Sequence, residues 1–234
     1  MKNYLGIAKY YAQKCLFDKY AIPKIKYEKI SKTLLKKYLP EKPIVIDCGA
    51  HDGADSVELA KILKGEIHSF EPVNNLFSRL KTNTHNFPNI YCYEIALSNK
   101  NGSQDFYISE GRSDASSSLL MPKAHLDDHP DTFFKTKITV KTLTLDYWAE
   151  INKIEKVDLL WLDMQGFELN MLEVSEKILA KVSVIHTEVS TKETFVGVAQ
   201  YAEYREFLEN KGFNVVLEAI PVGWDMGNVL FVRK

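Results

Sequence analysis

The sequence has little cysteine and no long apolar run, and these two absences exclude several classes of protein. The three cysteines, Cys15, Cys48 and Cys92, are scattered along the chain, and no two of them have C-x-x-C spacing. This pattern argues against a disulfide framework and against a structural zinc site. No run of about 18 apolar residues occurs, and the first residues lack the continuous apolar stretch of a signal peptide. We therefore expect a cytoplasmic protein without a transmembrane segment.

The chain also has little net charge, although the charge is unevenly distributed. The formal charge is −1, but residues 1–40 hold ten lysines against Asp18 and Glu28, a net charge of +8, so the remainder carries −9. We predict that residues 1–41 form a short, basic, helical arm whose lysines lie on solvated helix faces. The alternatives are contact with an anionic membrane surface, with nucleic acid, or with a second copy of the chain in a homodimer.

Residues 42–234 are predicted to form one α/β domain, because segments with strand and helix patterns alternate along them. The last two strands are joined by a loop around Pro221 that is too short for a parallel crossover. We therefore predict a doubly wound, mostly parallel seven-strand sheet with an antiparallel C-terminal hairpin at or near its edge. The predicted strands are 44–48, 66–70, 90–95, 157–163, 182–188, 213–219 and 227–233, and the predicted helices are 55–63, 73–84, 144–151, 168–179 and 199–211.

The alternation is interrupted between residues 100 and 142. Segments 104–109 and 137–142 have the pattern of extra short strands, and they enclose a polar stretch that contains Ser116 and His125. A loop of this length in a compact domain is more often functional than incidental. We expect it to lie over the carboxyl ends of the strands, where substrates enter, and a disordered segment is the alternative.

The segment 43–53, PIVIDCGAHDG, has the pattern of a cofactor loop, because a β-branched run ends in an Asp and two glycines before a helix. Gly49 and Gly53 permit a tight turn whose backbone approaches a ligand closely. The next predicted strand ends at Glu71, 18 residues after Gly53, where a carboxylate can bind ribose hydroxyls. A dinucleotide site needs a third glycine, so the pattern favours S-adenosylmethionine, and a plain strand-to-helix turn is the alternative.

A second motif, VDLLWLDMQGFELNML at 157–172, ends a buried strand in Asp163. Together with VIDCGAHDG, HSFEP, ALSN at 96–99, SSSL at 116–119, TLTLD at 142–146 and HTEVS at 186–190, it closely resembles the FkbM-type methyltransferases. Those are S-adenosyl-L-methionine-dependent enzymes with the Rossmann-like, seven-strand class I methyltransferase fold. The resemblance covers residues 43–234, and its motifs follow the family's order.

The resemblance implies a cofactor site in which Glu71 binds the ribose hydroxyls and Ala96 and Leu97 lie beside the adenine. The chain departs from the family at His51, where Asn is usual, and at Gln165, where Glu is most common. The cofactor-binding residues that it implies are Asp47, Gly49, Ala50, His51, Gly53, Glu71, Ala96, Leu97 and Asp163.

Methyl transfer to a hydroxyl requires a base or a metal near the acceptor oxygen, because a protonated alcohol is a poor nucleophile. Asp163 and Glu188 end two neighbouring strands, and His186 shares strand parity with Glu188, so all three could converge on the cleft. We predict Asp163 as the acceptor-binding group or base, with His186 and Glu188 as further catalytic residues. A helix N-cap for Asp163 and a core histidine for His186 are the structural alternatives. Asp163 with Glu188 could bind Mg²⁺, but two ligands are too few to assign a metal site.

The sequence is therefore interpreted as an S-adenosylmethionine-dependent O-methyltransferase. The resemblance supplies the reaction class and the preference for a hydroxyl of a sugar, glycan or secondary metabolite. A nucleic-acid methyltransferase that uses the basic arm is one alternative, disfavoured by the acidic body and by the lack of an N/D-P-P-Y/F motif. The others are a nicotinamide-dependent dehydrogenase, disfavoured by the missing glycine, and a non-catalytic module that binds the cofactor.

Overall fold

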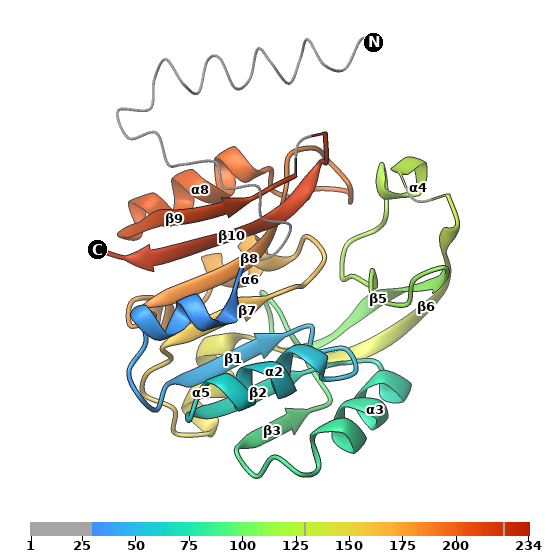
Figure 1. The fold of residues 1–234 in the computed structure, drawn as a ribbon. Helices are drawn as coiled ribbons and strands as arrows, with labels where there is room; N and C mark the ends of the chain where they lie inside the picture. The colour runs from blue at the N-terminus through green and yellow to red at the C-terminus, as the bar shows by residue number, and fades with distance from the viewer. Residues whose placement is uncertain (1–29, 129, 222) are drawn as a thin grey trace, which may run out of the picture.

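A seven-stranded sheet with strand order β3-β2-β1-β7-β8-β10-β9 forms the centre of the structure (Figure 1). This computed structural model describes residues 30–234 apart from 129 and 222. The parallel strands are β1 (Ile44–Cys48), β2 (Glu66–Phe70), β3 (Ile90–Tyr93), β7 (Leu159–Leu162) and β8 (Val184–Ser190). Strand β10 (Met226–Arg233) is antiparallel to both β8 and β9 (Phe213–Ala219). The predicted fold, with its antiparallel pair at the sheet edge, is confirmed.

Helices cover both faces of this sheet, which explains why its central strands are continuous apolar runs. On one face, α2 (Ala54–Ile62) and the 3₁₀ helix η1 (Lys32–Lys37) pack on β1 and β7, and α3 (Asn74–Thr84) lies beside α2. The other face packs against α5 (Leu145–Ile151), α6 (Glu168–Glu173), α7 (Glu176–Leu179) and α8 (Tyr201–Asn210). The carboxyl ends of the parallel strands remain open for a site.

A second, smaller sheet projects from the first (Figure 1). It has the order β4-β6-β5 and consists of β4 (Ala96–Leu97), β5 (Gly102–Gly111) and β6 (Thr132–Leu143). These strands contain the two extra segments that the sequence predicts, at 104–109 and 137–142. Residues 112–131 connect β5 to β6 and are here called the excursion. They include the short helix α4 (His125–Asp128).

Most of the predicted strands and helices have the observed bounds to within two residues, and two of them differ in arrangement. The strand predicted at 90–95 ends at Tyr93, and Ala96–Leu97 instead pairs with β6 in the second sheet. The helix predicted at 168–179 is divided into α6 and α7. At the division the Ser175 hydroxyl donates to the Met171 carbonyl at 2.6 Å, and such a bond competes with helix propagation.

Most of the predicted basic arm, residues 1–29, lies outside the described residues, so its helical character and the domain boundary stay predictions. In the described part, Lys32 is buried, and its ammonium donates to Asp55 and Glu58 at 2.5 Å each. The same ammonium lies 4.8 Å from the centre of the Trp161 ring. At this position the lysine is an internal ion-pair partner and does not lie on a solvated face. No helix in the described part of the chain is long and apolar enough to cross a membrane.

Candidate active site

The loop after β1 is pressed against the end of β7, and this contact requires glycine. Gly49 has φ +79°, and a Cβ there would lie 1.9 Å from the carbonyl oxygen of Asp163. Gly53 has φ +86° and immediately precedes α2, where an added Cβ would lie 2.7 Å from Leu80. The N–H groups of Gly49 and Ala50 donate to the carbonyl of Phe70 at 3.1 and 3.0 Å, which holds the loop to the end of β2. Both glycines thus have the conformation that the motif predicts.

Glu71, the acid at the end of β2, is buried beside this loop. One of its carboxylate oxygens accepts from the N–H of His51 at 3.0 Å, and the other accepts from the N–H of Val73 at 2.8 Å. Burial raises the pKa of Glu71 to about 7, although these two hydrogen bonds act to lower it. Its carboxyl group is therefore fixed in orientation at the wall of a cleft.

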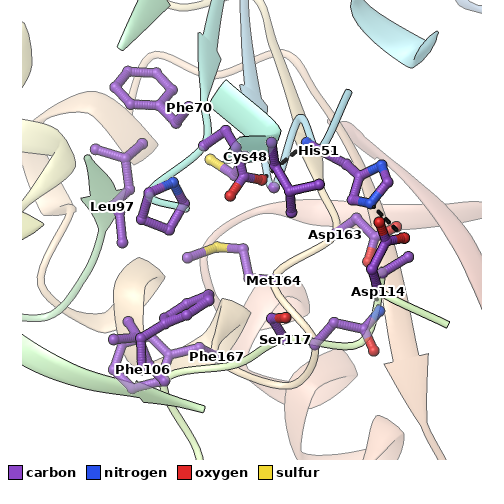
Figure 2. A pocket seen from close by; sticks show the side chains of 18 residues that line it. Cys48, His51, Phe70, Leu97, Phe106, Asp114, Ser117, Asp163, Met164 and Phe167 are labelled. Carbon is purple, nitrogen blue, oxygen red and sulfur yellow. Dashed lines mark hydrogen bonds and ion pairs between the residues drawn. The ribbon is translucent and has the colours of Figure 1, made fainter. Parts of the chain in front are cut away.

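That cleft, here called the cofactor cleft, has about 660 Å³ of empty space and lies between the loop, the strand ends and the excursion (Figure 2). The predicted residues that line it are Gly49, His51, Glu71, Ala96, Leu97 and Asp163. The sequence interpretation missed further lining residues, among them Phe106, Asp114, Ser117, Leu119, Met164 and Phe167. Two signals were available for them, the apolar alternation of the inserted strand and the polar stretch after it.

Asp47, Ala50 and Gly53, all of them described, are not among the lining residues. The Asp47 carboxylate instead accepts from the Ser56 hydroxyl at 2.5 Å, and Ser56 contacts Ser69 at 2.8 Å. Burial raises the pKa of Asp47 to about 7. In this structure Asp47 therefore accepts from the first turn of α2 and holds that helix to the end of β1.

The excursion is tied to the cofactor loop by ion pairs. His51 Nε2 lies 3.0 Å from Asp114 Oδ1, the contact drawn as a dashed line in Figure 2. Arg79, from α3, donates to Asp114 and to Asp52 at 3.1 Å each. Partial burial acts to raise the pKa of Asp114, but His51 and Arg79 lower it below its usual value. The excursion therefore closes one side of the cofactor cleft through charged contacts.

At the end of β7 the chain turns through two left-handed residues, Gln165 at φ +52° and Gly166 at φ +96°. This turn directs the Gln165 side chain between two carboxylates. Its Nε2 lies 2.8 Å from Asp163 Oδ1 and 2.8 Å from Glu188 Oε2, so one amide donates to both. The Gln165 carbonyl accepts from the Ser118 hydroxyl at 2.8 Å, which anchors the turn to the excursion.

The two bridged carboxyls are less acidic than free carboxyls. Asp163 is open to the cofactor cleft but lies deep in the protein, and this burial raises its pKa while the Gln165 hydrogen bond lowers it. Burial raises the pKa of Glu188 well above its usual value, and the nearby charges of Asp163 and Glu168 raise it further. The two carboxyls therefore titrate as a pair, and burial disfavours a charge on both at once.

A second cleft, here called the outer cleft, has about 1120 Å³ of empty space and reaches from Glu188 to the loop between β9 and β10. Gln165 lines both clefts, so they meet where its amide bridges Asp163 and Glu188. The residues that line the outer cleft are Ser116, His125, Gln165, Glu188, Ala219, Pro221, Gly223, Trp224, Asp225, Met226, Gly227 and Asn228. The predicted pair Asp163 and Glu188 is thus brought together by Gln165, with Asp163 at the wall of the cofactor cleft and Glu188 at the wall of the outer cleft.

Residues 47–215 match the Methyltransferase FkbM domain. The chain belongs to the FkbM methyltransferase family. The match starts in β1 and ends in β9, so it includes the cofactor loop, the excursion and both bridged carboxyls. The family resemblance seen in the sequence motifs is confirmed.

One relative is the 2-O-methyltransferase NoeI of Sinorhizobium fredii, 32% identical over 161 residues, which are 66% of this chain and 66% of that protein. The match thus spans just under two thirds of that relative's length. Two solved structures share the fold at low sequence identity. Magnesium protoporphyrin IX methyltransferase (ChlM) from Synechocystis, solved with bound SAM, has a TM-score of 0.51 at 11% identity, over 86% of this chain and 74% of that one. The fibrillarin pre-rRNA processing protein of Methanococcus jannaschii has a TM-score of 0.51 at 16% identity, over 89% of this chain and 71% of that one.

In this FkbM-family chain His186, although itself described, lines neither cleft. Its ring stacks on Trp161 on the face of the sheet that η1 and α2 cover. The strand parity that was expected to place it beside Glu188 does not bring it to the site.

No group of three or more His, Cys, Asp or Glu side chains in the described part of the chain is arranged to hold a metal ion. Asp163 and Glu188 each accept a hydrogen bond from the Gln165 amide, which lies between them. Mg²⁺ therefore has no ligand set among these residues.

Proposed function

We propose that this chain is an S-adenosylmethionine-dependent O-methyltransferase whose acceptor is a hydroxyl group of a sugar, glycan or other secondary metabolite. The observation that carries the proposal is the Gln165 amide, which bridges Asp163 and Glu188 where the cofactor cleft meets the outer cleft. A carboxylate at that junction is within reach of a donor in one cleft and an acceptor in the other.

The cofactor cleft fits S-adenosylmethionine in its chemistry. Gly49 lets the loop pack against the end of β7 at the wall of the cleft, and Glu71 presents a fixed carboxyl group suited to two ribose hydroxyls. Ala96, Leu97 and Phe106 offer an apolar surface for a flat base. When bound, this cofactor supplies a methyl group on a sulfonium that is already activated for transfer.

The protein's own contribution is to position the acceptor and remove its proton. Asp163, the one of the bridged pair that lines the cofactor cleft, accepts the proton of the hydroxyl. Burial raises the pKa of Glu188, and the charge of Asp163 raises it further, so Glu188 keeps its proton while Asp163 is ionised. Gln165 fixes the two carboxyls relative to each other, and the amide contributes orientation without adding a charge.

The relative NoeI supports oxygen as the methylated atom, because its name describes 2-O-methylation. The most direct test incubates the chain with S-adenosylmethionine and a panel of hydroxylated glycosides, and detects S-adenosylhomocysteine and methylated product by mass spectrometry. Asp163→Asn should keep S-adenosylhomocysteine binding and lose roughly 100- to 10,000-fold in turnover. Gln200→Ala, an exposed amide, is the control and should behave as wild type.

The Gln165→Glu variant separates orientation from charge. A third carboxyl between Asp163 and Glu188 should raise the pKa of the pair and move the rising limb of the pH–rate profile to higher pH. An Asp163→Asn enzyme with full turnover, or methyl transfer to nitrogen alone, would remove this mechanism. Thermal stabilisation by NAD in place of the two sulfur cofactors would remove the cofactor assignment.

A further inference from the structure

The side chain of Trp224 is 68% exposed, although it belongs to the wall of the outer cleft. The other two tryptophans, Trp148 and Trp161, are buried. An indole is a large apolar surface, and leaving it in water forfeits the free energy of burying it. Trp224 lies in the loop between β9 and β10, at the carboxyl ends of the parallel strands (Figure 1). The indole is therefore placed to cover a ligand.

The charges around the outer cleft select against anions. Its described lining residues include no lysine or arginine. The acids among them are Asp225 and Glu188, and Glu188 is the protonated member of the bridged pair in the proposed function. Lys192, just outside the lining, has its ammonium 2.9 Å from the Asp225 carboxylate. Among the described residues that line this wall, a phosphate group would meet the Asp225 carboxylate and no lysine or arginine, which disfavours nucleic acids and sugar phosphates.

Hydrogen-bonding side chains form a row that leads from the bridged carboxyls toward the indole. Asn228 of β10 is the register partner of Glu188 of β8, so the two side chains share one face of the sheet. The row therefore runs across adjacent strands from Asp163 through Gln165 and Glu188 to Asn228. Asn228 lines the same cleft as Trp224.

A flat apolar surface together with a row of hydrogen-bonding groups matches the two surfaces of a sugar ring. One face of a pyranose carries C–H groups that pack on an aromatic ring, and its edge carries hydroxyls that bind amides and carboxylates. A purely aromatic acceptor would use the indole but leave the polar row unpaired, at a cost in desolvation.

We propose that Trp224 is a stacking platform for an uncharged sugar ring of the acceptor, with Asn228 and Asp225 binding its hydroxyls. This proposal rests on the O-methyltransferase function above and names its substrate class. It makes Trp224 a specificity-determining residue that acts in acceptor binding and leaves cofactor binding unchanged.

Tryptophan fluorescence tests the proposal directly, because Trp224 is the solvent-exposed one of the three. With S-adenosylhomocysteine present, the chain is titrated with methyl glycosides of neutral hexoses, 6-deoxyhexoses and N-acetylhexosamines. A saturable blue shift with at least one of them is expected, with no shift from hexose 6-phosphates or from catechol. Trp224→Phe should remove the shift.

Matched variants then separate stacking from folding. Trp224→Ala should raise the KM for the responding glycoside at least 10-fold with kcat and S-adenosylhomocysteine affinity little changed, and Trp224→Tyr should restore most of the loss. Tyr147→Ala, which removes another exposed aromatic ring, is the control.

An unchanged KM in Trp224→Ala would overturn the proposal, and so would a response to catechol or phosphates in place of neutral glycosides, or no response from any glycoside. If S-adenosylhomocysteine still binds in that last case, only the Trp224 proposal fails. If the wild-type chain does not bind S-adenosylhomocysteine at all, the proposed methyltransferase function is itself wrong.

Discussion

The imidazole of His186 and the indole of Trp161 stack face to face, with ring centres 3.5 Å apart and planes 3° apart. The two residues are register partners in β7 and β8, and the Trp161 indole donates to Asp55 at 3.2 Å. Burial lowers the pKa of His186 to about 3. The ring is therefore neutral near physiological pH and acts as packing between two strands.

We expect His186→Phe to keep nearly full methyltransferase activity, because a phenyl ring preserves the stack. The midpoint of thermal unfolding should change little, whereas His186→Ala should lower stability by roughly 2 to 4 kcal/mol through the lost packing. Turnover and S-adenosylhomocysteine affinity of both purified variants provide the measurement. A loss of more than 100-fold in kcat for a folded His186→Phe protein would restore His186 to the catalytic group.

Replacement of Gly49 by alanine should abolish cofactor binding or prevent folding, because the added Cβ would lie 1.9 Å from the Asp163 carbonyl oxygen. Gly197→Ala is a matched control, since Gly197 has φ +74° but no atom within 4 Å of an added Cβ. That control carries only the backbone strain, on the order of 1 kcal/mol. Isothermal titration with S-adenosylhomocysteine and urea unfolding compare the two. Equal effects would show that the close approach to Asp163 is not needed.

Asp47→Asn should stabilise the protein at alkaline pH. The folded pKa of Asp47, about 7, exceeds the unfolded value, so its contribution to stability is present at low pH and lost as pH rises through about 7. The unfolding free energy of the variant relative to wild type should therefore increase by roughly 1 to 4 kcal/mol between pH 4 and pH 8. His68 and His186, whose pKa values are lowered by burial, affect both proteins equally. Asp105→Asn, at an exposed site, controls for the loss of a carboxylate, and a flat difference for Asp47→Asn would contradict the prediction.

Asp114→Ala should weaken S-adenosylhomocysteine binding about 3- to 10-fold, because it removes the contacts to His51 and Arg79 that tie the excursion to the cofactor loop. High salt should lower the S-adenosylhomocysteine affinity of the wild-type protein toward that of the variant, because these charged groups are partly exposed and are screened by salt. Asp131→Ala, in the same excursion, should leave affinity unchanged. Titrations at low and high ionic strength check this, and an Asp114→Ala protein with wild-type affinity and salt dependence would show that these ion pairs do not close the cleft.

The cofactor half of the fold was predictable because its signals are local. Gly49 and Gly53 permit the left-handed backbone of the loop, and apolar runs predict β1 and β7 as buried strands, so the loop and its neighbours follow from residue chemistry. The proximity of Asp163 and Glu188 was also predictable, since neighbouring parallel strands end at one edge of a sheet.

The placement of individual side chains required information that the sequence pattern lacks. Asp47 shares strand parity with Val45 and so points to the α2 side, a signal that the motif interpretation passed over. His186 shares strand parity with Glu188, but it does not reach the site because of its position along β8. The last register pair between β7 and β8 is Leu162 with Thr187. Glu188 lies beyond that pair and is reached by Gln165, whereas His186 is still covered by Trp161. The bridge by Gln165 depends on the left-handed backbone of Gln165 itself and on Glu188, which lies 23 positions further along the chain. No local sequence pattern encodes this combination.

The two clefts are built largely from separate stretches of the chain, with Gln165 as their shared residue. The cofactor wall comes from residues 48–119 and 163–167, whereas most of the outer wall comes from 219–228. Loops of this kind accept insertions and substitutions without disturbing the sheet that carries them. Under the proposed function, exchange of the β9–β10 loop between relatives is therefore a direct route to engineered acceptor preference.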